Sequence, residues 1–70
     1  MTLSVHHYRK RNGHSKRYPA EGKPPDLSPA AALSLIASLT ARFPGSRAYA
    51  VALNPARTYD AAELLQMTVP

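Results

Sequence analysis

The chain has 70 residues, no cysteine and a formal net charge of +5, from nine lysines and arginines against four acidic residues. This length allows one domain with a thin hydrophobic core, and the absence of cysteine excludes both a disulfide and a Cys-type zinc site. Packing, a second copy of the chain or another partner must supply the stability. We therefore expect one small domain over residues 1–70, compatible with a homo-oligomer.

No segment of the sequence predicts export or membrane insertion. Residues 1–5 are too few and too polar for the apolar core of a signal peptide, and the cations follow them instead of preceding them. The most apolar stretch, residues 30–39, has about half the length of a membrane span and is interrupted by Ser34 and Ser38. We expect a cytoplasmic protein with no membrane partner.

The first element in the chain is strongly basic. Residues 6–18 hold five lysines and arginines, three histidines and two tyrosines, and residues 1–20 hold no acidic side chain. Such a segment attracts polyanions by charge, and its aromatic side chains can stack on nucleic-acid bases. The residues predicted to contact nucleic acid (DNA or RNA) or an acidic protein surface are Tyr8, Arg9, Lys10, Arg11, Lys16, Arg17 and Tyr18.

Residues 1–20 fit either a flexible arm or a β-hairpin. In the hairpin, Asn12-Gly13 forms a two-residue type I′ turn. That turn places Arg9 directly opposite Lys16 on the neighbouring strand. Opposed cations repel one another, so such a hairpin gains stability when an anion lies across it.

A linker and a well-defined helix follow. Residues 21–27 are predicted as a linker because Pro24-Pro25 favours extended backbone. Ser28 then caps a helix over residues 30–43, with Pro29 at the first helical position and Pro44-Gly45 as the end signal. The apolar stripe of this helix consists of Ala32, Leu35, Ile36, Leu39 and Phe43.

Residues 47–53 alternate as a strand does. Tyr49, Val51 and Leu53 share one face, which can carry the packed core or a partner surface. The alanines between them make a second face that a helix or another backbone can approach closely. Asn54-Pro55 turns the chain, and Thr58 is predicted to cap a last helix from residue 59 to about residue 67.

These elements predict a small α+β domain that consists of an N-terminal basic hairpin or arm, a central helix, one strand and a short C-terminal helix. We expect residues 1–20 to form the basic element and residues 28–70 to form a body that supplies the core. Without the hairpin, the single strand needs a partner strand from another chain.

Residues 58–68 resemble the opening of helix-turn-helix segments in excisionase-like and MerR-like DNA-binding proteins. The resemblance implies a helix followed by a turn and a recognition helix that enters the major groove, and the 70 residues contain no such recognition helix. No DNA-reading residue is carried over from the family.

The sequence has little that favours catalysis or metal binding. Asp60 and Glu63 are one helical turn apart on a face that should be solvated, and there is no glycine-rich phosphate loop. Adjacent His6 and His7 point to opposite sides of a strand, so they do not complete a ligand set with His14. We predict a protein that is not an enzyme, has no metal site and uses no cofactor.

Two functions from different classes remain open. The first is nucleic-acid binding, in which the cations contact phosphates while Tyr8 and Tyr18 stack on bases or frame the site. The second is a small phage or mobile-element protein that binds and inhibits a host protein complex through the same basic surface. The composition, rich in alanine and arginine, is typical of a bacterial or phage source.

Overall fold

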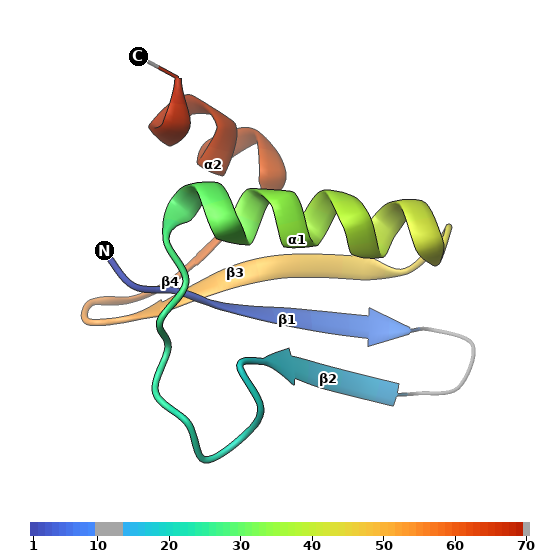
Figure 1. Cartoon of the computed structure of the whole chain (residues 1–70), viewed down its shortest axis with the longest axis horizontal. Coiled ribbons are helices and arrows are strands. Elements are labelled where there is room, and N and C mark those ends of the chain that lie inside the picture. The colour runs from blue at the N-terminus through green and yellow to red at the C-terminus, as the bar shows by residue number, and fades with distance from the viewer. Residues whose placement is uncertain (10–13, 70) are drawn as a thin grey trace.

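The computed structural model describes residues 1–9 and 14–69, with His14 described by its backbone alone. Its elements in chain order are β1 (Ser4–Arg9), β2 (His14–Tyr18), α1 (Pro29–Arg42), β3 (Arg47–Leu53), β4 (Ala56–Tyr59) and α2 (Ala61–Thr68) (Figure 1).

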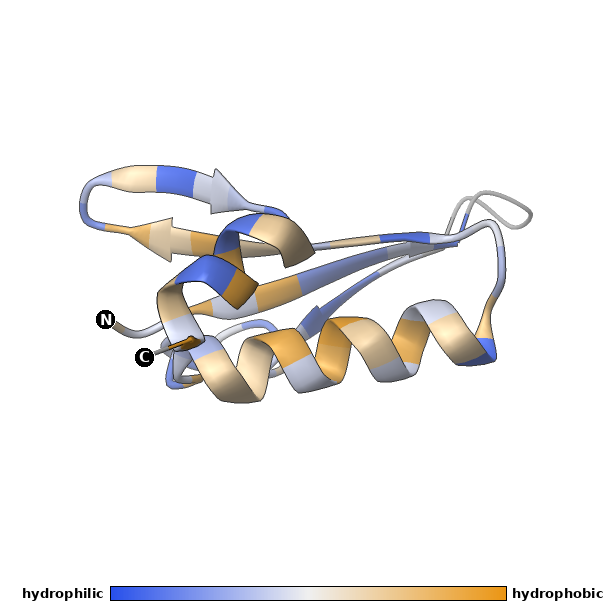
Figure 2. Ribbon diagram, turned by 90° about the horizontal axis from the view of Figure 1, so that it is seen from above, coloured by the Kyte–Doolittle hydropathy of each residue, from blue (hydrophilic) through white to orange (hydrophobic). Residues whose placement is uncertain are grey.

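The four strands form one antiparallel sheet in the order β2-β1-β3-β4, so β1 and β3 are its central strands. The first two strands make one hairpin, the last two make another, and α1 connects the two hairpins. Figures 1 and 2 show α1 along the sheet with α2 beside it. Both helices contribute to the core on one face of the sheet, and no helix of the described residues covers the other face, which we call the open face.

The core lies between the helices and the alternating side chains that face them. In β3 these are the alanines, and Ala50 is completely buried, so the close approach of a helix that the strand pattern predicts is confirmed. The buried hydrophobic residues are Leu3, Val5, Ala32, Ile36, Leu39, Ala50, Ala52, Tyr59 and Leu64.

α1 begins and ends within one residue of its predicted bounds. The Oγ of Ser28 accepts a hydrogen bond of 3.2 Å from the backbone N–H of Ala31, and Pro29 occupies the first helical position. At the other end, the N–H of Phe43 donates to the carbonyl of Leu39, and Gly45 follows with a φ of 86° that favours glycine.

The predicted layout, with one strand after an N-terminal hairpin or arm and a central helix, is wrong, because the described residues form a sheet of four strands. The short β4 has no apolar alternation, and it is a strand because it pairs with residues 50–53 of β3. Thr58 therefore pairs with Val51 instead of capping a helix. The cap is Asp60, which forms a reciprocal capping box with Glu63, so the resemblance to a helix-turn-helix opening spans part of a strand and then α2.

Of the two alternatives for the N-terminal segment, the structure has the hairpin, with a different register. Arg9 pairs with His14, and Lys16 pairs with His7, so the predicted apposition of Arg9 and Lys16 is wrong. Because the register shifts by two residues, every side chain stays on the face of the sheet that was predicted for it. The shift removes the repulsion between Arg9 and Lys16, and it pairs Val5 with Tyr18 beside the core. The predicted Asn12-Gly13 turn lies outside the described residues.

The core is not confined to residues 28–70, because the N-terminal segment also contributes to it. Leu3 and Val5 are both completely buried, because β1 is a central strand of the sheet. Leu3 also exchanges two backbone hydrogen bonds, of 2.8 and 2.9 Å, with Leu27, which ties the segment between β2 and α1 to the sheet.

Within the described part of the chain, neither helix has the length and apolar character that crossing a membrane requires.

Candidate nucleic-acid interface

The strand period divides the predicted binding residues between two faces of the sheet. Successive side chains of a strand point to opposite sides. Tyr8 and Arg17 therefore lie on the open face, whereas Arg9, Lys16 and Tyr18 lie on the helix side, where the last three line a common cavity. The predictions for Lys10 and Arg11 fall outside the described residues.

The open face carries aromatic rings on its two central strands. His6 of β1 and Tyr49 of β3 are register partners, and their rings stack with centroids 5.6 Å apart and an interplanar angle of 17°. The guanidinium carbon of Arg47 lies 5.5 Å from the centre of the Tyr49 ring. A flat aromatic pair with a cation beside it thus lies in the middle of the sheet.

Tyr8 continues this surface toward the hairpin. It lies two residues beyond His6 on the same face of β1, and its register partners are Ser15 on β2 and Arg47 on β3. The residue is 42% exposed, although it lies on a central strand of the sheet. The ring is therefore accessible between a small polar residue and a cation.

Arg17 bounds the same surface at the edge strand. It is the register partner of His6 on β2, and its Nη1 donates a 3.1 Å hydrogen bond to the carbonyl of Ala20. This bond uses one of the five guanidinium N–H groups and leaves the others to act as donors. The cross-strand row therefore runs from Arg17 through His6 to Tyr49.

A cavity of about 350 Å³ adjoins the open face at the other edge of the sheet. It exists because β4 pairs only with residues 50–53, so residues 47–49 of β3 have no partner strand on that side. The residues that line it are Arg47, Tyr49, Thr58, Tyr59, Asp60 and Glu63. The stacked ring of Tyr49 is thus reached both from the open face and from this edge.

Sequence reasoning missed three residues of this surface, namely His6, Arg47 and Tyr49. The alternation of residues 47–53 places Tyr49 on a common face with Val51 and Leu53, and the same period places His6 with Tyr8. The strand pattern does not indicate whether the Tyr49 face carries the core or a partner surface, so it does not predict that Tyr49 belongs to the binding surface.

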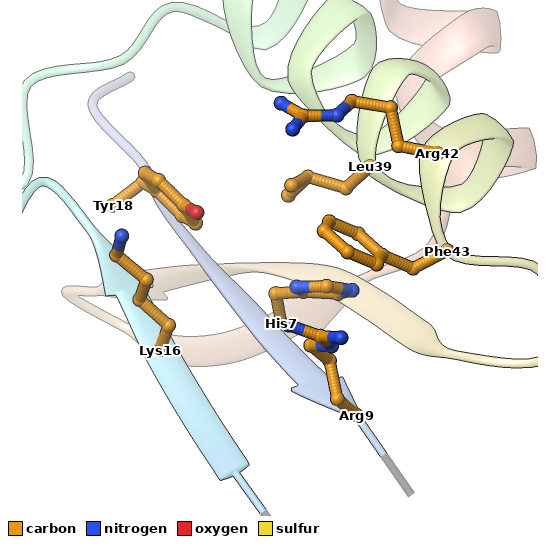
Figure 3. Close-up of a pocket in the computed structure, with 7 residues that line it drawn as sticks. All are labelled: His7, Arg9, Lys16, Tyr18, Leu39, Arg42 and Phe43. Carbon is orange, nitrogen blue, oxygen red and sulfur yellow. The ribbon is translucent and has the colours of Figure 1, made fainter. Parts of the chain in front are cut away.

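The helix side of the hairpin holds a second cavity, of about 330 Å³. Figure 3 shows Tyr18 and Phe43 on opposite sides of it, with Leu39 between them and His7 below. The cavity forms where β1 becomes hydrophilic beyond its buried apolar residues, a change that Figure 2 shows along the strand.

His7 forms part of this second cavity and is 2% exposed. Its Nε2 lies 2.9 Å from the Oγ of Ser46, and that hydroxyl donates a 2.6 Å hydrogen bond to the carbonyl of Phe43. Since the hydroxyl has one proton, it accepts from Nε2–H, and the lone pair of the neutral ring is on Nδ1. Burial, and then repulsion from Arg9, lower the pKa of His7 below its ordinary value of 6.5.

The carboxylates near α2 have structural partners. Asp60 Oδ1 accepts from the N–H of Glu63 at 2.8 Å, and Glu63 Oε1 accepts from the N–H of Asp60 at 3.3 Å. Glu63 also forms a 2.8 Å salt bridge with Arg57. In residues 1–9 and 14–69, no group of three or more histidine, aspartate or glutamate side chains is arranged to hold a metal ion.

A comparison with known proteins does not relate this chain to any of them: no family model, no curated protein and no solved structure matches it.

Proposed function

We propose that this protein binds single-stranded nucleic acid on the open face of its sheet. The observation that carries the proposal is the stacked pair of His6 and Tyr49 on the two central strands, with the exposed ring of Tyr8 beside it. Aromatic side chains on an uncovered sheet are platforms on which bases stack, and stacking contributes about 1–3 kcal/mol for each base.

Single strands suit this surface better than duplexes. The rings lie on a broad sheet, which does not enter a groove, and the bases of a duplex already stack on their neighbours. The Cα atoms of Tyr8 and His6 are about 6.8 Å apart along the strand, because each residue of an antiparallel strand rises about 3.4 Å. Unstacked bases of a single strand can therefore reach separate rings.

The cations on this face supply attraction to the phosphates. Arg17 and Arg47 lie at opposite ends of the aromatic rows, and neither pairs with a carboxylate: among the described residues, the only salt bridge joins Arg57 to Glu63. A single-stranded nucleic acid that crosses the sheet with its bases on the aromatic rings brings its phosphate backbone past both guanidinium groups. This arrangement combines a charged path with stacking platforms.

The experiment that tests the proposal is a fluorescence anisotropy titration of labelled single-stranded RNA and DNA of about ten nucleotides, beside the corresponding duplex, at about 50 mM salt. Tyr8→Ala should weaken single-strand binding by about tenfold. Met67→Ala is the matched control, because Met67 has the same exposed fraction of 42% and lies on α2, away from the open face.

Two outcomes contradict the proposal. One is duplex binding as tight as single-strand binding, which would indicate attraction by charge alone. The other is the absence of binding to any of these nucleic acids at the lower salt concentration, which would make an acidic protein surface the partner to test next.

A further inference from the structure

The cavity on the helix side of the hairpin gathers positive charge from three elements. Arg9 comes from β1, Lys16 from β2 and Arg42 from the last turn of α1. None of the four acidic residues of the sequence lines this cavity. Arg42 is favourably placed at the negative end of the helix dipole, but this does not account for the two cations that meet it from the sheet.

The cations lie close to the apolar walls of the cavity. The guanidinium carbons of Arg9 and Arg42 lie 4.1 Å and 5.4 Å from the centre of the Phe43 ring. The Nζ of Lys16 lies 5.2 Å from the centre of the Tyr18 ring. These contacts hold the charged groups at the cavity without neutralising them, because an aromatic ring has no net charge.

The remaining lining adds no negative charge. His7 directs Nε2–H toward Ser46, and Leu39 contributes only apolar atoms. Like charges around one cavity repel one another, so an anion placed between them relieves the repulsion and gains charge-assisted hydrogen bonds.

We infer that this cavity binds a phosphomonoester carried on a compact aromatic body, such as a nucleoside monophosphate. Two guanidinium groups and one ammonium group line the same cavity, and arginine forks are well suited to the oxygens of a phosphate. Tyr18 and Phe43 lie on opposite sides of the cavity and offer aromatic side chains for contact with the organic part (Figure 3). The volume of about 330 Å³ falls in the range of small-ligand sites, roughly 300–1,000 Å³.

This site is independent of the proposed interface, because it lies on the other face of the sheet. Its probe is phenyl phosphate, which combines an aromatic ring with a phosphomonoester and contains no base. Titration of the ¹⁵N-labelled full chain, followed by amide NMR, should give saturable shifts at Tyr18, Leu39 and Phe43. Phenyl phosphate should bind about tenfold more tightly than inorganic phosphate, because only the former has a ring for the apolar walls.

Three variants that each remove one positive charge distinguish binding in this cavity from attraction of phosphate to the net positive charge of the protein. Arg42→Gln and Lys16→Gln should each weaken phenyl phosphate binding by about tenfold. Lys23→Gln is the matched control, because Lys23 is exposed in the segment between β2 and α1 and does not line this cavity, and it should leave this binding unchanged. Equal weakening by all three variants, equal affinity for phenyl and inorganic phosphate, or the absence of saturable shifts at these residues would overturn the inference.

Binding of phenyl phosphate and binding of oligonucleotides, measured separately, distinguish this inference from the proposed function. Phenyl phosphate binding that persists when no oligonucleotide binds would support the cavity and contradict the interface. Oligonucleotide binding that persists when phenyl phosphate gives no shifts would do the reverse. Competition with phenyl phosphate identifies the source of the phosphate group. Displacement by an oligonucleotide with a 5′-phosphate, but not by one with a 5′-hydroxyl, indicates the end of a nucleic-acid strand. Displacement by adenosine monophosphate alone indicates a free nucleotide.

Discussion

His7 and Ser46 are joined by a 2.9 Å hydrogen bond between Nε2 and Oγ, and this bond fixes the end of α1 against the first hairpin. The hydroxyl of Ser46 also donates a hydrogen bond to the carbonyl of Phe43, just after the helix. The Nε2–H of a buried imidazole thereby has an acceptor in the α1–β3 connection. The hydrogen bond links the sheet, the helix end and the wall of the basic cavity.

Stability should fall in mild acid because of His7. Its folded-state pKa is lowered by burial and by Arg9, whereas in the unfolded chain it is near 6.5. As the pH falls below about 6.5, the unfolded state takes up the proton first, so the free energy of unfolding decreases until the folded-state pKa is passed. Urea unfolding between about pH 8 and pH 5.5 measures this loss.

His7→Gln should make stability less dependent on pH over that range, because the amide can still donate to Ser46 but does not titrate. His6→Gln is the control, since it leaves His7 and its hydrogen bond in place. An unchanged pH profile in His7→Gln would show that another group is responsible.

Asp60→Ala should lower the free energy of unfolding by about 1 kcal/mol, because it removes the side-chain acceptor of the α2 capping box. Asp60→Asn keeps an acceptor at this position and should lose less. Asp26→Ala removes the same charge from an exposed position outside the helices and is the control for charge. Equal effects of the three substitutions in urea unfolding would contradict a capping role.

Ala50→Leu should lower stability by about 1–3 kcal/mol, because Ala50 is completely buried and a larger side chain forces α1 away from β3. Ala56→Leu makes the same change at an exposed position of β4 and should alter stability by no more than about 0.5 kcal/mol. Thermal or urea unfolding of both variants measures the difference. Tolerance of leucine at Ala50 would mean that the helix packs less closely on the alanine face.

Arg47→Gln should reduce the salt dependence of oligonucleotide binding. Neutralising a phosphate of a single strand contributes about −0.7 to the slope of log affinity on log salt, so two contacts by Arg17 and Arg47 give about −1.4 and the variant about −0.7. Lys23→Gln removes the same charge from the segment between β2 and α1 and should keep the full slope. Identical slopes in the two variants would indicate that Arg47 contacts no phosphate.

The division of the predicted basic site into two surfaces follows from the strand period together with the position of the helices. Tyr8 and Arg9 are adjacent in the sequence, and their alternation could be predicted. The neighbours of these side chains could not be predicted, because Tyr8 lies beside Arg47 only through the pairing of β1 with β3. Likewise, Arg42 joins Arg9 at one cavity only because α1 packs over the hairpin end of the sheet.

Signals that act within a few residues were sufficient for α1 and β3. Ser28, Pro29 and the Pro44-Gly45 pair bound the helix through local hydrogen bonding and backbone restriction, and the alanine alternation defines both faces of β3. Tertiary structure alone decided the strand order, the hairpin register and the existence of β4, whose residues 56–59 have no strand pattern of their own. The physical reason is that these features depend on backbone hydrogen bonds and side-chain packing between segments distant in sequence, which no local window contains.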